Sequence, residues 1–382
     1  MKSTKYILAI ITSATLLACN DHIVYPDPMG EPAKSLGIFL EDVEWFTILP
    51  DGSVAMPNHC SQTNAFVVTT VKRDGTYTSS DTVDNFVNFA SIIANQNGDI
   101  IVADHNYDDN VSSICKINQQ GKITPLNSAP MFVPLTLFNN GDVAYFQHEI
   151  INSTGDEHLV MHILGNNLTY IMEYDFTPED VTSFNNQIIL YNHFGEYCIY
   201  NTNGTMVANG NVKKSIYTVE YVDGSLYMLV WDGMVDSNSE SDTYSGLYYY
   251  RIIKMNTQGQ QLFTTKIVAT KIFTNFTVQN DMLIVTGSYI PDYNKNVGHG
   301  TIYLFDNNNG QLKDTISVDY KGCDILPFYV SPDKNGEYDV YSIRRENYTE
   351  IPDYQHGIAN FYQGDVFMYH TNDLHNLQIE NY

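Results

Sequence analysis

Basic residues are scarce in this chain. Its 382 residues include 19 Lys and Arg against 44 Asp and Glu, for a formal net charge of −25. Nucleic acids and anionic polymers held by charge need a basic surface, so the composition argues against both as partners. The composition still allows such polymers to bind through a local Arg cluster or a metal. Charged residues make up only 16% of the chain while tyrosine alone occurs 29 times. We therefore expect a surface of Asn, Ser, Thr and Tyr, which suits neutral, hydroxyl-rich partners.

Cysteine is also rare, and familiar catalytic motifs are missing. The chain has five cysteines and no CxxC spacing. Beyond Cys19, the spacing of Cys60, Cys115, Cys198 and Cys323 allows one or two disulfides in an oxidising compartment and leaves their pairing open. Cys115 and Cys198 lie within apolar strand patterns, so we predict that both are buried free thiols. There is no GxSxG, P-loop or dinucleotide fingerprint.

Helical periodicity is nearly absent, and a repeat takes its place. Each repeat is a polar turn, an apolar strand of about four residues, and a marked position seven residues past the turn. Four copies, residues 50–59, 96–105, 139–148 and 184–193, end in His59, His105, His148 and His193. Three more, residues 222–231, 279–288 and 334–343, fit without the histidine. A period of about 45 residues with only short strands predicts the four-stranded blades of a β-propeller.

A second family of turns, such as Asp74-Gly75 and Gln258-Gly259, lies between the first. Two hairpins per repeat give four strands, and seven repeats use about 340 residues. We therefore predict an all-β propeller of seven four-stranded blades over residues 36–382. Two stacked sandwiches are the rival interpretation, but they give no reason for a regular spacing. Residues 36–40 are predicted to pair with a final strand near residues 365–369 and close the ring.

The N-terminus has the pattern of an export signal. Lys2 and Lys5 precede an apolar run at residues 6–11, which is too short to span a membrane. Residues 16–19, Leu-Leu-Ala-Cys, resemble the lipobox of bacterial lipoproteins, although an ordinary secretory signal with a chance cysteine is the alternative. The resemblance implies a signal peptide over residues 1–18, a lipidated (palmitate-bearing) Cys19 and a tether over residues 19–35. Without residues 1–18, 17 basic residues face 44 acidic ones, for a net charge of −27.

Signal, acidic composition and propeller repeat together resemble the surface lipoproteins of Bacteroidota that work beside outer-membrane nutrient importers. The resemblance covers the signal and the architecture, and no family-specific motif transfers binding residues. It implies a lipid-anchored protein of the outer membrane, on the cell surface or the periplasmic face, with a TonB-dependent transporter as a partner.

The histidines mark one predicted face. In propellers, the connection between the second and third strands opens on the face that most often binds ligands, and the four histidines fall where second strands end. They could form a wall that binds a ligand or a divalent metal, or they could be packing residues bonded to the backbone of a neighbouring blade. Neighbouring second strands are about 10 Å apart, roughly twice the strand spacing, so four such histidines cannot share one zinc ion.

Blades 5 to 7 break the histidine pattern and have long predicted connections, at residues 232–246, 289–300 and 344–363. Long loops on a rigid scaffold often carry binding function. Two of them share the tetrad Ile-Pro-Asp-Tyr, at residues 290–293 and 351–354, which offers aromatic faces and carboxylates or is a turn motif copied with the blade. Trp231 is either a stacking platform or a buried filler. With the four histidines, the predicted binding residues are Trp231, Tyr289, Asp292, Tyr293, Arg344, Asp353 and Tyr354.

The sequence therefore predicts a lipid-anchored binding protein that captures a neutral glycan or another nutrient. One alternative is a metal-dependent propeller enzyme such as a polysaccharide lyase, with a divalent metal on histidines near the axis. Another is a structural subunit of a surface complex. No catalytic residue can be assigned from the sequence.

Overall fold

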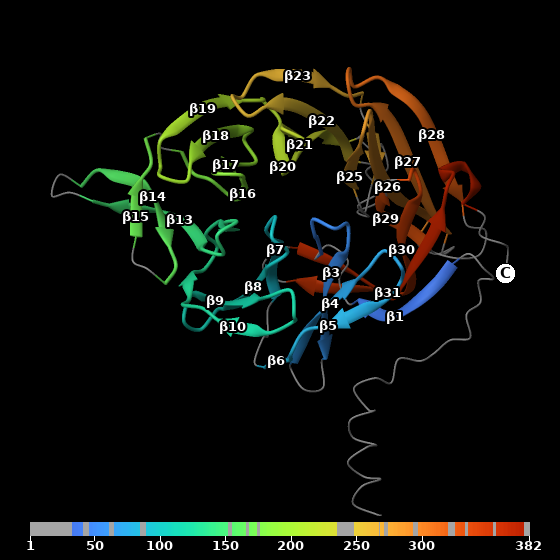
Figure 1. Cartoon of the computed structure of the whole chain (residues 1–382), viewed down its shortest axis with the longest axis horizontal. Coiled ribbons are helices and arrows are strands. Elements are labelled where there is room, and N and C mark those ends of the chain that lie inside the picture. The colour runs from blue at the N-terminus through green and yellow to red at the C-terminus, as the bar shows by residue number, and fades with distance from the viewer. Residues whose placement is uncertain are drawn as a thin grey trace, which may run out of the picture.

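The computed structural model describes most of the chain after residue 32. The described residues are 33–40, 46–60, 65–84, 89–151, 155–165, 168–173, 176–234, 248–266, 268–270, 274–292, 297–319, 325–332, 335–353 and 357–377. These residues form seven antiparallel sheets, each built on four strands, arranged in a ring (Figure 1). The predicted seven-bladed β-propeller is confirmed.

The blades follow one another along the chain, and each runs from the inside of the ring to the rim. Blade 1 contains β2 (Thr47–Ile48), β3 (Val54–Cys60), β4 (Ala65–Val71) and β5 (Tyr77–Ser79), with β6 (Val83–Asp84) also on β4. Blade 2 contains β7 (Phe89–Ala94), β8 (Ile100–Asn106), β9 (Val111–Ile117) and β10 (Ile123–Pro125), with β11 (Ala129–Pro130) also on β9. Blade 3 contains β12 (Leu135–Leu137), β13 (Val143–Ile150), β14 (Glu157–Ile163) and β15 (Leu168–Ile171).

Blade 4 contains β16 (Asp180–Phe184), β17 (Gln187–Tyr191), β18 (Glu196–Asn201) and β19 (Met206–Asn211). Blade 5 contains β20 (Ser215–Val222), β21 (Ser225–Met234), β22 (Tyr248–Asn256) and β23 (Gln261–Thr264), with β24 (Val268–Thr270) also on β22. Blade 6 contains β25 (Thr274–Gln279), β26 (Met282–Asp292), β27 (Val297–Asp306) and β28 (Leu312–Asp319). Blade 7 contains β29 (Ile325–Pro332), β30 (Tyr338–Asp353), β31 (Gly357–Thr371) and β1 (Ala33–Leu40). The one helical element in the described ranges is the short 3-10 turn η3 (Leu374–Asn376).

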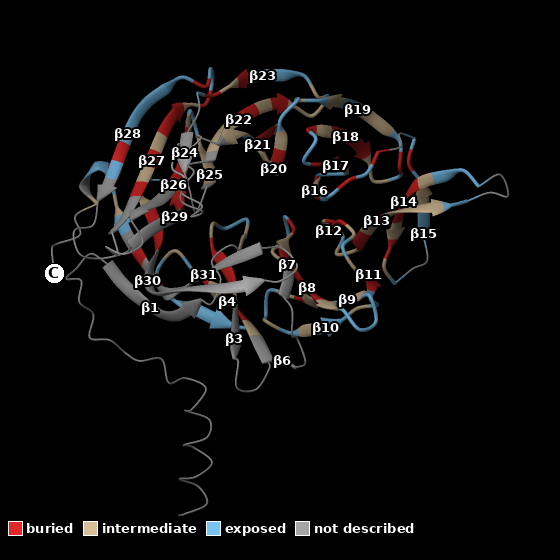
Figure 2. Cartoon of the chain, turned by 180° about the vertical axis from the view of Figure 1, so that it is seen from behind, coloured by how far each residue is buried: buried red, intermediate tan, exposed pale blue. Residues whose placement is uncertain are grey.

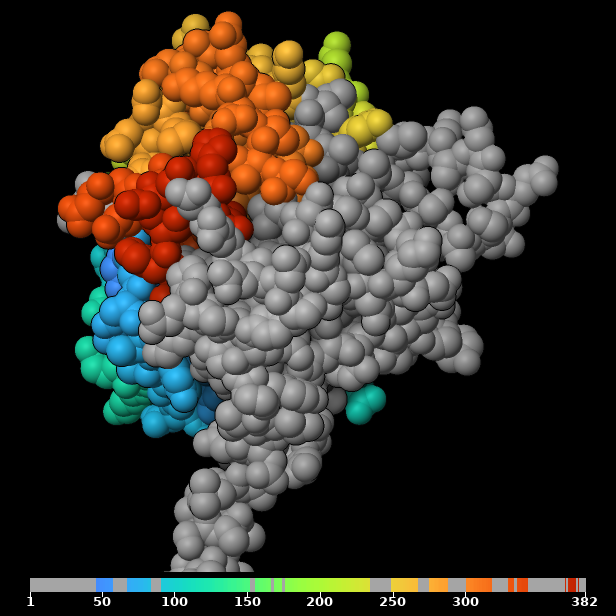
Figure 3. Space-filling model, turned by 90° about the vertical axis from the view of Figure 1, so that its right-hand side faces the viewer, coloured from blue at the N-terminus to red at the C-terminus, as the bar shows by residue number. Residues whose placement is uncertain are grey.

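The ring is closed by the first strand of the chain. β1 pairs with β31, so that Ala33 lies opposite Tyr369 and Phe39 lies opposite Asp365. This confirms the predicted pairing and makes β1 the outer strand of blade 7. Figure 3 shows the described part of blade 7 (red) between blade 6 (orange) and blade 1 (blue).

Two families of tight turns give the propeller two different faces. The turns between first and second strands and between third and fourth strands lie on one face, which we call the hairpin face. The turns between second and third strands lie on the opposite face, which we call the histidine face. Gly98, with φ +79°, and Asn185, with φ +51°, supply the left-handed backbone that the tight hairpin turns require.

The hydrophobic core lies between adjacent blades. Successive residues of a strand point to opposite sides of its sheet. On β8, Ile100 and Val102 therefore pack with blade 1, while Ile101 and Ala103 pack toward blade 3. Figure 2 shows buried residues (red) on the middle strands and exposed ones (pale blue) on outer strands such as β15 and β28. In the described part of the chain, no helix offers an apolar stretch long enough to cross a bilayer.

Two predicted long connections are largely strand, and this corrects the sequence interpretation. In blade 6, β26 continues to Asp292 and β27 begins at Val297 opposite it. In blade 7, β30 continues to Asp353 and β31 begins at Gly357 opposite it. Both regions contain several β-branched and aromatic residues, whose β preference outweighs the single proline in each tetrad. The third predicted loop lies mostly at residues 235–247, outside the described residues.

Candidate functional site

The histidine face carries the marked positions of the repeat. His59 lies in β3, His105 in β8 and His148 in β13, while His193 lies two residues past the end of β17. Ile101 and Ala103 face blade 3, so the alternation of the strand turns His105 toward the same interface. The seventh position after each turn therefore lies where one blade meets the next. The side chain of His59 lies outside the described residues.

His105 sits in a small aromatic cluster. Its Nδ1 atom is 2.9 Å from the hydroxyl oxygen of Ser112. Its ring centre is 4.8 Å from that of Phe132, edge to face, and 6.3 Å from that of Tyr107. Burial lowers the pKa of His105 below its usual value, and the nearby Asp104 carboxylate opposes that shift. The imidazole is therefore neutral near pH 7 and can exchange hydrogen bonds with a neutral ligand.

His148 and His193 each have a different local partner. The Nε2 atom of His148 is 3.0 Å from the backbone carbonyl oxygen of Phe176, in the link to blade 4, as the packing interpretation predicts. The Nδ1 atom of His193 contacts one carboxylate oxygen of Glu179, and the other oxygen accepts the backbone N–H of His193 at 2.7 Å. Within the described ranges, no group of three His, Cys, Asp or Glu side chains is placed to hold a metal ion. The structure thus gives His105, His148 and His193 three different partners.

Exposed aromatic side chains gather on the histidine face. Among the described residues, six aromatic side chains are exposed. Five belong to turns, links or strand ends of this face: Tyr107, Phe132, Phe194, Tyr217 and Trp231. The sixth, Tyr77, begins β5 beside a turn of the hairpin face. Phe132 and Phe194 are each 67% exposed, far more than packing alone would leave them.

Phe132 is held in an unusual backbone conformation. Its φ is +62°, in the left-handed region that bulky residues rarely adopt. The backbone N–H of the preceding Met131 donates to the carbonyl of Asn110, which fixes this link beside the turn that carries Tyr107. Such strain costs about 1–3 kcal/mol and is concentrated at functional sites. The conformation presents the phenyl ring to solvent next to His105.

Trp231 is a surface residue, 38% exposed, which favours the platform interpretation over the buried filler. It lies opposite Ser215 on β20 and Tyr250 on β22, and the Tyr250 ring contacts Tyr217 edge to face at 5.8 Å. Blade 5 therefore brings three aromatic side chains together at the end of its sheet.

Charged groups lie beside Trp231. Asp232, whose side chain is 5% exposed, forms ion pairs with Lys214 and Arg251. Burial alone would raise the pKa of Asp232, but hydrogen bonds and charge attraction from the two cations hold it below its usual value. Both cations remain partly exposed and can donate further hydrogen bonds. Sequence reasoning missed Lys214 and Arg251 because no motif links these distant positions.

The other predicted binding residues lie at the extended hairpins of blades 6 and 7. The backbones of Tyr289 and Asp292 are in β26, and those of Arg344 and Asp353 are in β30. The side chains of these four, and Tyr293 and Tyr354 altogether, lie outside the described residues. Both tetrads reach hairpin tips, because each strand ends at the tetrad's aspartate.

Glu220 is an acidic group that the sequence pattern did not single out. It lies on β20, the innermost strand of blade 5, opposite Tyr227. Burial raises its pKa to about 8. Near neutral pH this carboxyl group therefore holds its proton much more readily than an exposed glutamate.

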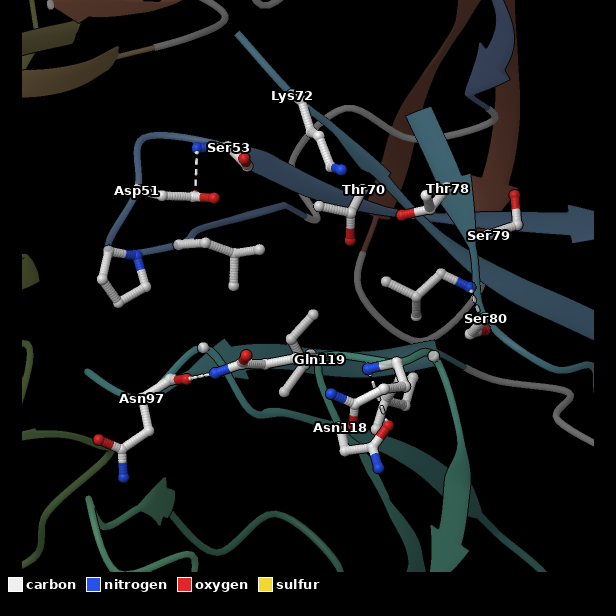
Figure 4. Close-up of a pocket in the computed structure, with 18 of the residues that line it drawn as sticks. Asp51, Ser53, Thr70, Lys72, Thr78, Ser79, Ser80, Asn97, Asn118 and Gln119 are labelled. Carbon is white, nitrogen blue, oxygen red and sulfur yellow. Dashed lines mark hydrogen bonds between the residues drawn. The ribbon is translucent and has the colours of Figure 1, made fainter. Parts of the chain in front are cut away.

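A groove opens on the hairpin face, opposite to the face that the sequence predicts. It lies between blades 1 and 2 and has a volume of about 490 Å³. Figure 4 shows Thr70, Lys72 and Thr78 on one wall and Asn97, Asn118 and Gln119 on the other. The repeat does not reveal it, because it depends on side chains from two blades.

Comparisons with known proteins identify no relative of the chain by sequence. No protein-family model matches it, and no curated protein matches it. Among solved structures it is similar to the WD40 β-propeller domain of Doa1, at 12% identity and a TM-score of 0.48, covering 88% of this chain and 97% of that one. It is also similar to BamB from Moraxella catarrhalis, at 12% identity and a TM-score of 0.46, covering 91% and 99%. A streptogramin B lyase matches at 14% identity and a TM-score of 0.42, covering 88% and 96%.

Proposed function

We propose that this chain is a lipid-anchored, extracytoplasmic binding protein that captures a neutral, hydroxyl-rich ligand, such as a glycan, on its histidine face. The observation that carries the proposal is the gathering there of five of the six exposed aromatic side chains among the described residues. An acidic chain with few charges and many tyrosines suits such a ligand better than a polyanion.

The chemistry of the face fits sugar rings. The flat apolar side of a sugar packs on an aromatic ring, as Phe132 and Trp231 offer, while its hydroxyls need nearby donors and acceptors. His105 contacts the Phe132 ring, and Lys214 and Arg251 flank the residue next to Trp231. Each aromatic platform therefore has a polar group beside it.

The N-terminal sequence supports the lipid anchor in this proposal. Cleavage before Cys19 would leave a lipid on this residue, and residues 20–32 are the short connection to β1. The protein would then stand at the outer membrane beside a nutrient importer of the TonB-dependent class, to which it hands its ligand. A metal-dependent lyase is less well supported, because His105, His148 and His193 bond to three different local partners.

The test is a binding screen of neutral oligosaccharides against the purified chain and three variants. Phe132→Ala and Trp231→Ala remove platforms on the histidine face, and Tyr77→Ala removes an aromatic ring on the other face whose exposure, 55%, lies between those of the two. We expect each of the first two to weaken binding about tenfold or more, and Tyr77→Ala to leave it unchanged. Equal affinity of all four proteins for every bound glycan would refute the proposal.

A further inference from the structure

Long side chains bridge neighbouring blades on the hairpin face. The Nζ atom of Lys116 in blade 2 is 3.4 Å from the carbonyl oxygen of Gly141 in blade 3. The Nζ atom of Lys254 in blade 5 is 3.0 Å from the carbonyl oxygen of Asn307 in blade 6. In both blades the side chain crosses from the third strand to the next blade and occupies the space between them.

Blade 1 has a short side chain at the same place. Lys116 and Lys254 each lie five residues before the glycine of the turn between third and fourth strands, and in blade 1 that position is Thr70. A threonine cannot span the gap between two blades. The groove of about 490 Å³ opens here, a size within the usual range for small-molecule sites.

The wall from blade 1 carries a cation and two hydroxyls. Val68 and Thr70 alternate along β4, so they point to the same side, and Thr78 lies directly opposite Thr70 on β5. Lys72 directly follows the last residue of β4 and lines the groove with them. Within the described residues, the side chains of Thr70 and Thr78 form no hydrogen bond, and that of Lys72 forms no hydrogen bond or ion pair. After the hydrogen bonds from Thr76, the Lys72 charge also helps to lower the pKa of the nearby Asp74 carboxyl group. Thr70, Lys72 and Thr78 all line the groove (Figure 4), and Val68 and Ile100 add apolar surface to its lining.

The wall from blade 2 is largely committed to its own turns. The side-chain oxygen of Asn118 accepts the backbone N–H groups of Gln120 and Lys122, both at 3.0 Å. The amide of Gln119 donates to the backbone carbonyl of Asn97. This wall is fixed in place, so the groups available to a ligand lie mainly on blade 1.

We infer that this groove binds a monosaccharide-sized, hydroxyl-rich ring that carries one carboxylate, such as a hexuronic acid. Among the described residues that line it, Lys72 is the one cation, and it takes the carboxylate, while the hydroxyls of Thr70 and Thr78 bond to the ring substituents. Asp51 is the one acidic residue in the described part of the lining, and it accepts from a ring hydroxyl and repels a second anionic group. This site is separate from the aromatic face and does not depend on the function proposed for it.

The test titrates the purified full chain with galacturonate and glucuronate, and with galactose and glucose as neutral counterparts, by calorimetry or ligand-observed NMR. Thr70→Lys places in the groove the lysine that blades 2 and 5 have, and Lys72→Met removes the cation. Lys122→Met is the matched control, because it removes an exposed lysine of blade 2 that does not line the groove. Thermal unfolding checks that every variant is folded.

We expect a uronate to bind, and both groove variants to weaken that binding by about tenfold or more while the control leaves it unchanged. Absence of uronate binding to the native chain overturns the inference. So does neutral-sugar binding of equal strength, or an equal loss in the control. A chain that binds uronate but no neutral oligosaccharide would support this inference and remove the proposed function of the other face.

Discussion

Arg73 is the main polar contact between the first and last blades, and its removal should weaken the closed ring. Its guanidinium lies 3.0 Å from the Asp339 carboxylate and 3.0 Å from the carbonyl oxygen of Ser331, and it also donates to the carbonyl of Pro332. The Asp339 side chain is 1% exposed and that of Arg73 is 26% exposed. The substitution Arg73→Met keeps most of the apolar stem and removes every one of these bonds.

The size of the effect follows from the burial of Asp339. Removing one partner of a buried ion pair costs about 3–5 kcal/mol, because a charge is left without its partner. His370 still contacts the other oxygen of Asp339, at 2.8 Å, so we expect the lower value, about 3 kcal/mol. With an unfolding entropy of about 2.1 cal/mol/K per residue, a domain of about 340 residues loses about 4 °C of Tm for that energy.

Chemical and thermal unfolding of the native chain, Arg73→Met, Asp339→Asn and the double variant provide the assay. The two single changes should be strongly coupled in a double-mutant cycle, because they remove the same interaction. Lys72→Met is the matched control: it removes the same charge one residue away, at an exposed side chain, and should change the free energy of unfolding by less than about 0.5 kcal/mol. A loss below about 1 kcal/mol for Arg73→Met would show that this contact does not hold the ring closed.

Two further predictions concern titratable groups. Burial raises the pKa of Glu220 from 4.5 to about 8, so the folded state loses stability as pH rises from the lower value to the higher one. The full shift from 4.5 corresponds to about 5 kcal/mol, and the side chain is partly exposed, which reduces the effect. We therefore expect Glu220→Gln to raise the free energy of unfolding by about 2 kcal/mol at pH 9 and not at pH 4. Denaturant unfolding at the two pH values measures this difference. A gain that is independent of pH would contradict the assigned cause. Cys115 and Cys198 are buried free thiols, and burial raises the pKa of Cys198 to about 12, so neither should react with iodoacetamide in the native chain at pH 8. Mass spectrometry that finds rapid native-state alkylation at either position would refute this burial.

Much of the fold could be predicted because its signals are local. A turn with Gly98 or Asn185 and the strand beside it lie within a few residues, and their repetition gives the number of blades. The pairing of β1 with β31 followed from the need to close the ring. The thiols of Cys115 and Cys198 are free and buried, as their strand context predicts. Cys323 and the side chain of Cys60 lie outside the described residues.

The site was harder to predict because it depends on contacts between blades. The sequence placed the marked histidines on one predicted face and left Trp231 either exposed or buried. It did not show that Phe132 and Tyr107 lie beside His105, since these residues come from separate segments that the pairing of β11 with β9 brings together. Similarly, nothing in the sequence marks Thr70. Only the folded blades show that it takes the position at which blade 2 has the bridging Lys116. The sequence interpretation treated the extended hairpins of blades 6 and 7 as loops, because each Ile-Pro-Asp-Tyr tetrad contains a proline and proline is rare inside a strand.

The most direct test of the central claim is the affinity of a neutral glycan that the screen identifies, measured by calorimetry on the native chain and on Phe132→Ala, Trp231→Ala and Tyr77→Ala. The account predicts a loss of about tenfold or more for the two residues of the histidine face and no change for Tyr77. Loss of binding in Tyr77→Ala alone, or unchanged binding in the first two, would contradict it.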